Sequence, residues 1–208
     1  MKDRIVGGVL DYIKKNKSLT IEEEEKMLYG LESIYLMITK MIIIFALALF
    51  LGIFKEMLIY LLIFNIIRFT AFGIHATKSW ICLIVSSLLF LGVPFICKII
   101  VMPIYLKIIL GIFSTLLILK NSPADTINRP IINKKKRRIY KTISTIISIT
   151  FTILSLYTSN FLSNALLFSL LQEVIFISPI TYKVFKLPYN NYINYLKEIE
   201  RNDENVFS

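Results

Sequence analysis

Long apolar tracts with few charged residues constrain this chain more than any other feature of its sequence. The charged side chains gather in three places: up to Glu32, between Arg129 and Lys141, and from Lys183 onward. Only 18% of the 208 residues are charged, whereas soluble domains carry about 25%. A soluble globule would need polar faces on the tracts between these clusters, and the tracts have none. We therefore predict an all-α polytopic membrane protein rather than a soluble enzyme, a disordered chain or a disulfide-stapled secreted domain.

Six apolar tracts predict about six membrane-spanning helices, at residues 33–54, 57–67, 79–97, 99–119, 139–157 and 161–180. The tract at 57–67 has only eleven residues, whereas a helix needs about 20 to cross the hydrocarbon core. We expect it to be a short, tilted or re-entrant element. It is retained as a span because the alternation of basic and non-basic connections depends on it.

The basic residues predict that both chain ends lie in the cytoplasm. With the N-terminus inside, Arg68, Lys78 and the basic run 134–138 all fall on the inner side, and the outer turns hold only Lys55 and Lys98. This bias follows the positive-inside rule. A composition rich in Ile, Lys and Asn favours a bacterial source, so the expected location is a bacterial cell membrane. The net charge of +10 then indicates contact with membrane lipid and not with nucleic acid.

Three parts follow from this interpretation. Residues 1–32 form two short cytoplasmic amphipathic helices, the second over 21–28 with a capping box from Thr20 to Glu23. Residues 33–182 form the helical bundle, interrupted by a loop within 68–82 and a basic loop within 121–141. Residues 183–208 form a cytoplasmic tail.

The candidate chemistry lies in His75 and Cys82. One histidine and two cysteines, with no zinc, Walker or dinucleotide motif, predict no metal and no cofactor. On a continuous helix, positions seven apart are separated by roughly 10.5 Å, too far for a nucleophile and its base. A break that folds His75 over the helix start would bring them together, and Gly73 with an N-cap at Ser79 permits one. Cys82 would then lie in the first helical turn, where the helix dipole favours a thiolate.

Blander interpretations stay open for each of these residues. A cysteine in a membrane span often only packs, and Cys97, at the far end of the same span, is interpreted that way. Glu32 opens the first span and either points outward or faces the bundle, where it would orient the imidazole. Asp125 competes for that supporting role, although a loop-capping carboxylate beside Arg129 is an alternative.

Three motifs, in order between the expected spans, give the chain a specific resemblance. They are Tyr-Gly-Leu-Glu at 29–32, the segment 68–82 with its histidine-to-cysteine spacing, and Ser-Pro-Ala-Asp-Thr-Ile-Asn-Arg-Pro-Ile at 122–131, followed by the basic run. Over almost its whole length the chain resembles the accessory gene regulator protein B (AgrB) family. These proteins are membrane cysteine endopeptidases of Gram-positive peptide quorum sensing. The chain departs from the family at 72–73, which reads Phe-Gly where the family usually has Gly-Gly, and this puts substrate preference in question.

The resemblance implies that Cys82 and His75 cleave the C-terminal tail of an AgrD-like propeptide through an acyl-enzyme thioester and promote its cyclisation to a thiolactone or lactone. It also suggests a homodimer. We expect the basic residues of the loop to attract the acidic tail of the substrate; these are Arg129, Lys134, Lys135 and Lys136.

Two other classes of function remain as alternatives. A small membrane transporter or exporter of a peptide would need ionisable or discontinuous elements near the bilayer midplane. Only Lys40, Glu173 and the region of Pro103 approach that description. A non-catalytic scaffold would use Cys82 for packing alone.

Overall fold

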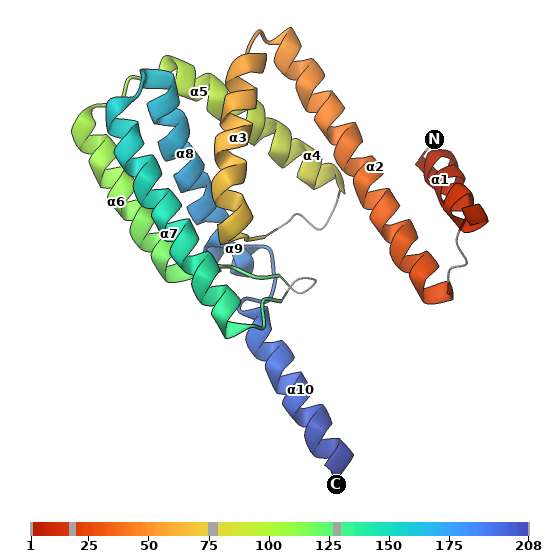
Figure 1. The fold of residues 1–208 in the computed structure, drawn as a ribbon. Helices are drawn as coiled ribbons and strands as arrows, with labels where there is room; N and C mark the ends of the chain where they lie inside the picture. The colour runs from red at the N-terminus through yellow and green to blue at the C-terminus, as the bar shows by residue number, and fades with distance from the viewer. Residues whose placement is uncertain (1, 17–19, 75–78, 127–129, 208) are drawn as a thin grey trace.

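Helices make up the regular secondary structure of the part of the chain that is described. In a computed structural model, these are residues 2–16, 20–74, 79–126 and 130–207 (Figure 1). The elements are α1 (Lys2–Asn16), α2 (Ile21–Phe50), α3 (Phe54–Ala71), α4 (Ser79–Ser87), the π-helical turn η1 (Leu88–Gly92), α5 (Val93–Ile99), α6 (Ile104–Asn121), α7 (Lys134–Tyr157), α8 (Asn160–Ile177), α9 (Pro179–Val184) and α10 (Asn191–Phe207). The described residues contain an isolated bridge between Phe72 and Ala124 and no strand, which confirms the all-α prediction.

Five helical segments of the described chain are long and apolar enough to cross a membrane. They are Glu22–Phe50, Ile81–Ile99, Ile104–Asn121, Lys134–Tyr157 and Asn160–Ile177. Large apolar side chains on these segments, such as Ile42, Phe113 and Ile146, are more than half exposed. Such outward apolar surface suits lipid and not water. The protein is therefore a membrane protein.

The predicted short second span corresponds to α3, and its length was underestimated. α3 has 18 residues, a length of roughly 27 Å. Each of those five segments contains a stretch of 18 residues with at most two charged side chains, whereas the 18 residues of α3 include Lys55, Glu56 and Arg68. α3 packs against α2, α5, α7 and α8, so protein surrounds much of this helix.

The first of the two predicted N-terminal helices is present as α1, but the second is not a separate short helix. The capping box is present, with the Glu23 amide donating to Thr20 Oγ1 at 3.3 Å and the Thr20 amide donating to Glu23 Oε2 at 2.9 Å. From there, however, α2 continues as one helix of 30 residues into the membrane-spanning part. No proline lies between Leu28 and Ser33, and a lone Gly30 does not end a helix. α1 lies beside α2 and is tied to it by the ion pair between Lys14 and Glu24.

The basic run is helical, although the sequence analysis placed it in a loop. α7 begins at Lys134, five residues before the predicted start of its span. Asn133 caps it by accepting from the amides of Lys135 at 2.9 Å and Lys136 at 3.1 Å. The run therefore forms the first turns of α7, with its backbone fixed.

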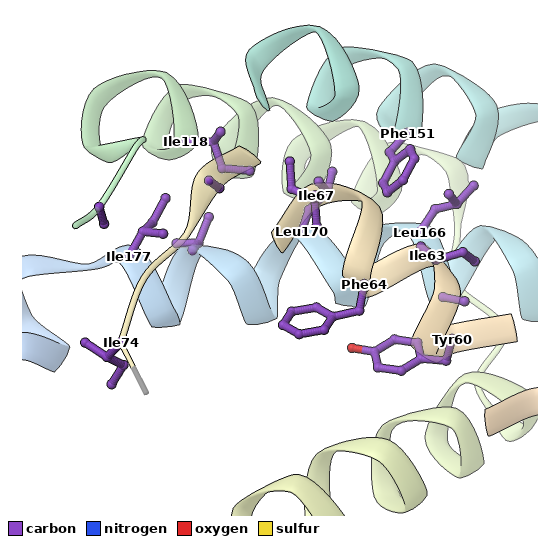
Figure 2. Packing of buried hydrophobic residues seen from close by; sticks show 14 of the residues in the cluster. Tyr60, Ile63, Phe64, Ile67, Ile74, Ile118, Phe151, Leu166, Leu170 and Ile177 are labelled. Atoms are coloured by element: carbon purple, nitrogen blue, oxygen red, sulfur yellow. The ribbon is translucent and has the colours of Figure 1, made fainter. Parts of the chain in front are cut away.

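The core joins α3 and α8 to the neighbouring helices α6 and α7. Tyr60 and Ile67 of α3 pack with Leu170 of α8, Ile118 of α6 and Phe151 of α7 (Figure 2). Figure 1 shows α6, α7 and α8 side by side, with α10 extending away from one end of the bundle. At that end the last turns of α3, α6 and α8 meet the first turn of α7.

Asn164 holds the C-terminal end of α5 by hydrogen bonds. The sequence had predicted that the next span follows this end almost directly. The amide of Asn164 donates to the carbonyls of Cys97 at 3.0 Å and Ile100 at 2.7 Å. These acceptors are left over where α5 ends, because the last carbonyls of a helix lack intrahelical donors. The next helix starts only after Pro103.

We expect Asn164→Ala to lower the free energy of unfolding by about 1–2 kcal/mol, because it removes two buried hydrogen bonds. Asn65→Ala is the matched control, since Asn65 also donates to a carbonyl, that of Leu61, but is exposed. Thermal unfolding in detergent micelles measures both variants. Equal melting temperatures would contradict the role given to Asn164.

Candidate functional site

Cys82 lies in the first turn of α4, as the sequence analysis predicts. The helix starts at Ser79 itself, one residue earlier than an N-cap at that position would place it. The thiol is free and the residue is half-buried, with Sγ 3.9 Å from Oγ of Ser86 one turn further on. α4 packs against α2 and η1. Cys97 is also a free thiol, but it is fully buried in the core, as expected of a packing residue.

His75 lies outside the described residues, and the chain that leads to it is held in place by backbone hydrogen bonds. The amide of Gly73 donates to the carbonyl of Ala124 at 2.8 Å, and the amide of Ile74 donates to the carbonyl of Phe176 at 3.1 Å. In return, the amide of Ala124 donates to the carbonyl of Ala71 at 2.9 Å. The segment between α3 and His75 is thus fastened both to the loop after α6 and to the end of α8.

Gly73 is required at its position for two separate reasons. Its φ of +103° lies in the region that side chains disfavour. A Cβ there would lie 2.5 Å from Nη1 of Arg68 and 2.8 Å from the carbonyl oxygen of Phe176. Phe72 before it also has a positive φ, 62°, and its ring packs edge-on against Tyr140 at 5.0 Å between centroids. The departure at Phe72 therefore adds a contact between the loop and α7.

Arg68 organises this segment from the last turns of α3. Its guanidinium donates to the carbonyls of Phe72 and Ile74, forms an ion pair with Glu173 at 3.5 Å, and lies 4.9 Å from the centre of the Phe176 ring. Glu173 is fully buried in α8. From the sequence alone, Arg68 indicated only the topology, and its pairing with Glu173 was not predicted. The signal available was a single acid in an apolar helix, because a buried charge requires a partner.

Asp125 is buried and caps its own loop, as the loop-capping interpretation predicts, by accepting from the amide of Ile131 at 3.4 Å. Its carboxylate accepts from the amides of Tyr192 at 3.0 Å and Asn191 at 3.2 Å, and from Arg137 at 3.3 Å. Arg129, the predicted partner, lies outside the described residues. Asp125 thus joins the loop after α6 to α7 and to the start of α10.

The carbonyl of Asp125 also accepts from the hydroxyl of Tyr182 at 2.9 Å. Burial, followed by the nearby Asp125 carboxylate, raises the pKa of Tyr182 above its ordinary value. The phenol therefore remains a neutral donor at physiological pH.

The remaining predicted site residues lie on helices. Glu32 is half-buried on α2, the helix against which α4 packs. Lys134, Lys135 and Lys136 are exposed on the first turn of α7. Among the described residues, no group of three or more His, Cys, Asp or Glu side chains is arranged to hold a metal ion.

Comparison with known proteins gives a consistent result over most of the chain. The family model described as Accessory gene regulator B matches residues 8–177. An AgrB-like protein of Clostridium acetobutylicum is 30% identical over 192 residues, which cover 91% of this chain and 92% of the relative. An AgrB-like protein of Listeria monocytogenes is 32% identical, covering 82% and 84%. One of Lactiplantibacillus plantarum is 30% identical, covering 86% and 88%. No solved structure gives a significant match.

We expect Gly73→Ala to destabilise the end of the bundle, because the added methyl would displace Arg68 or the end of α8. The cost should be about 1–3 kcal/mol, the range for an incompatible glycine position. Gly92→Ala is the control, since the nearest atom to its Cβ, on Leu88, is 3.9 Å away. Hydrogen exchange at the backbone amides of positions 73 and 74 should accelerate in the first variant only. Unchanged protection there would mean that the segment is not held as described.

Proposed function

Because this chain belongs to the accessory gene regulator B family, and so acts in the accessory gene regulator quorum-sensing system, we propose that it is a membrane cysteine endopeptidase for an AgrD-like propeptide. One observation carries the proposal. The free, half-buried thiol of Cys82 stands in the first turn of a membrane-spanning helix, shortly after a segment fastened up to the residue before His75. Such a position supplies a nucleophile at the start of a helix, beside the segment that carries His75.

The proposed reaction is an acyl transfer in two steps. The Cys82 thiolate attacks the scissile carbonyl at the end of the future signal, and the C–N bond breaks as His75 gives a proton to the departing amine. The C-terminal tail leaves and a thioester to Cys82 remains. A cysteine or serine side chain of the propeptide then attacks this thioester and releases Cys82 as the ring closes. Exchanging a thioester for a thiolactone changes the energy little, so exclusion of water decides against hydrolysis.

Arg68 and Glu173 are positioning residues in this proposal. The guanidinium holds the carbonyls of Phe72 and Ile74, and the buried carboxylate holds the guanidinium. The direction in which the chain enters His75 is therefore set by groups of α3 and α8. The same pairing weighs against the transporter alternative, since Glu173 is fully buried and bound to Arg68 instead of lining an open path.

Glu32 is the better of the two supporting candidates. The carboxylate of Asp125 is occupied by three backbone amides and Arg137, which makes its role structural. Glu32 is half-buried on α2 next to α4, a suitable place from which to orient or stabilise the imidazolium. A homodimer and a cytoplasmic position for both termini remain predictions.

We expect Cys82→Ala and His75→Ala each to abolish cleavage when the protein is expressed with its propeptide. The cleavage rate should fall by about 10³-fold or more, as it does when other enzymes lose a catalytic nucleophile or base. Cys97→Ala is the matched control and should keep cleavage, because that thiol is buried in the core. Mass spectrometry of the peptide products reads the result. Cleavage that persists in Cys82→Ala would remove the cysteine mechanism.

We also expect that replacing Lys134, Lys135 and Lys136 by glutamate raises KM for an acidic-tailed propeptide more than it lowers kcat. The reason is that attraction between the lysines and the acidic tail would contribute to substrate binding and not to the chemical step. The effect should shrink as salt rises, since the three lysines are exposed. The control is Lys55→Glu at the start of α3. An unchanged KM, or a change that is the same at all salt concentrations, would remove the basic run from substrate binding.

A further inference from the structure

A basic surface cavity lies where α6 ends and α7 begins. Its volume is about 540 Å³, and the side chains of Lys120, Arg137, Arg138 and Lys141 line it together with Tyr189 and Tyr192. None of the residues that line it is acidic. The cavity is distinct from the Cys82 region on α4.

Of these four cations, Arg137 is neutralised within the described part of the chain. It forms an ion pair with Asp125 at 3.3 Å, and its guanidinium lies 3.6 Å from the centre of the Tyr192 ring. For Lys120, Arg138 and Lys141, the described residues supply no ion-pair partner. Three like charges around one cavity repel each other, so an anion placed among them would be strongly favoured.

Apolar surface leads directly away from this cavity along both helices. On α6, Leu116 lies one turn before Lys120 and Phe113 lies two turns before it. On α7, Ile146 lies two turns after Arg138. Residues three, four, seven or eight apart share a helix face, and all three apolar side chains are more than half exposed. The ligand that fits has an anionic head and long apolar chains.

We propose that this cavity binds the headgroup of an anionic phospholipid, with its phosphate among Lys120, Arg138 and Lys141 and its acyl chains along α6 and α7. Basic pockets at the ends of membrane-spanning helices are suited to such headgroups, and arginine and lysine both bind phosphate oxygens. A bound lipid would hold the end of α6 and the start of α7, here called the α6–α7 corner, at the membrane boundary. Because Asp125 and Arg137 connect that corner to α10, the lipid would also stabilise the loop after α6.

The test uses the full chain in nanodiscs or mild detergent, with native mass spectrometry counting bound phosphatidylglycerol against phosphatidylcholine. The variant carries Lys120→Gln, Arg138→Gln and Lys141→Gln together. The matched control carries Lys134→Gln, Lys135→Gln and Lys136→Gln, which removes the same charge from the same corner but outside the cavity. At about fivefold in affinity for each basic residue near the headgroups, we expect the first variant to lose phosphatidylglycerol binding more than tenfold. The control should lose less than threefold.

Several outcomes would overturn the proposal. Equal losses in the two triple variants would mean diffuse attraction to charge, and equal binding of phosphatidylcholine would mean apolar contact alone. Displacement of lipid by millimolar inorganic phosphate would assign the cavity to a free anion, and displacement by an oligoglutamate peptide would assign it to an acidic peptide. If the triple variant does not fold, Lys120→Gln alone replaces it, because that side chain is exposed, and it should lose about fivefold.

Discussion

The structure depends on how one buried carboxylate is neutralised. Glu173 is fully buried near the C-terminal end of α8, and among the described residues Arg68, about a hundred residues earlier in the chain, supplies the opposite charge. Removing one partner of such a pair costs about 3–5 kcal/mol, because the other is left buried and uncompensated. The pair therefore fixes α3 against α8 more specifically than apolar packing alone, which tolerates rotation and sliding. Since the same guanidinium holds two carbonyls of the segment before His75, stability and the geometry of the proposed site rest on one interaction.

A second polar centre lies at the same end of the bundle and is connected to the first by backbone. The Asp125 carboxylate accepts hydrogen bonds from Arg137 and from the first amides of α10. The preceding residue, Ala124, forms backbone hydrogen bonds with the segment after α3. Loss of either set of polar contacts would therefore affect the other, because only a few residues separate them. The buried ion pairs and their hydrogen bonds are concentrated at the end of the bundle where α3, α6 and α8 finish. The rest of the bundle is held together largely by apolar contacts and by hydroxyl groups between helices.

The sequence predicted what local pattern determines and missed what distant partners determine. The apolar tracts led to the membrane-spanning helices, and the Thr20 capping box was correct in detail, because both signals lie within a few residues. The pairing of Arg68 with Glu173 escaped prediction, since no local pattern connects two positions so far apart in the chain. The loop-capping carboxylate at Asp125 was predicted, but its ion pair with Arg137 was not, because Arg137 lies twelve residues further along the chain on the next helix. The helical basic run was missed because the loop was predicted to continue to Arg138, whereas the Asn133 cap starts the helix five residues before the predicted span.

Phe72 shows how the chain accommodates its departure from the pattern of its family. A positive φ costs a residue with a side chain on the order of 1 kcal/mol relative to glycine. An edge-on aromatic pair is worth about 0.5–1.5 kcal/mol beyond its buried area, so the contact with Tyr140 offsets that cost. The Phe72 ring thereby ties the segment before His75 to α7, the helix that carries the basic run.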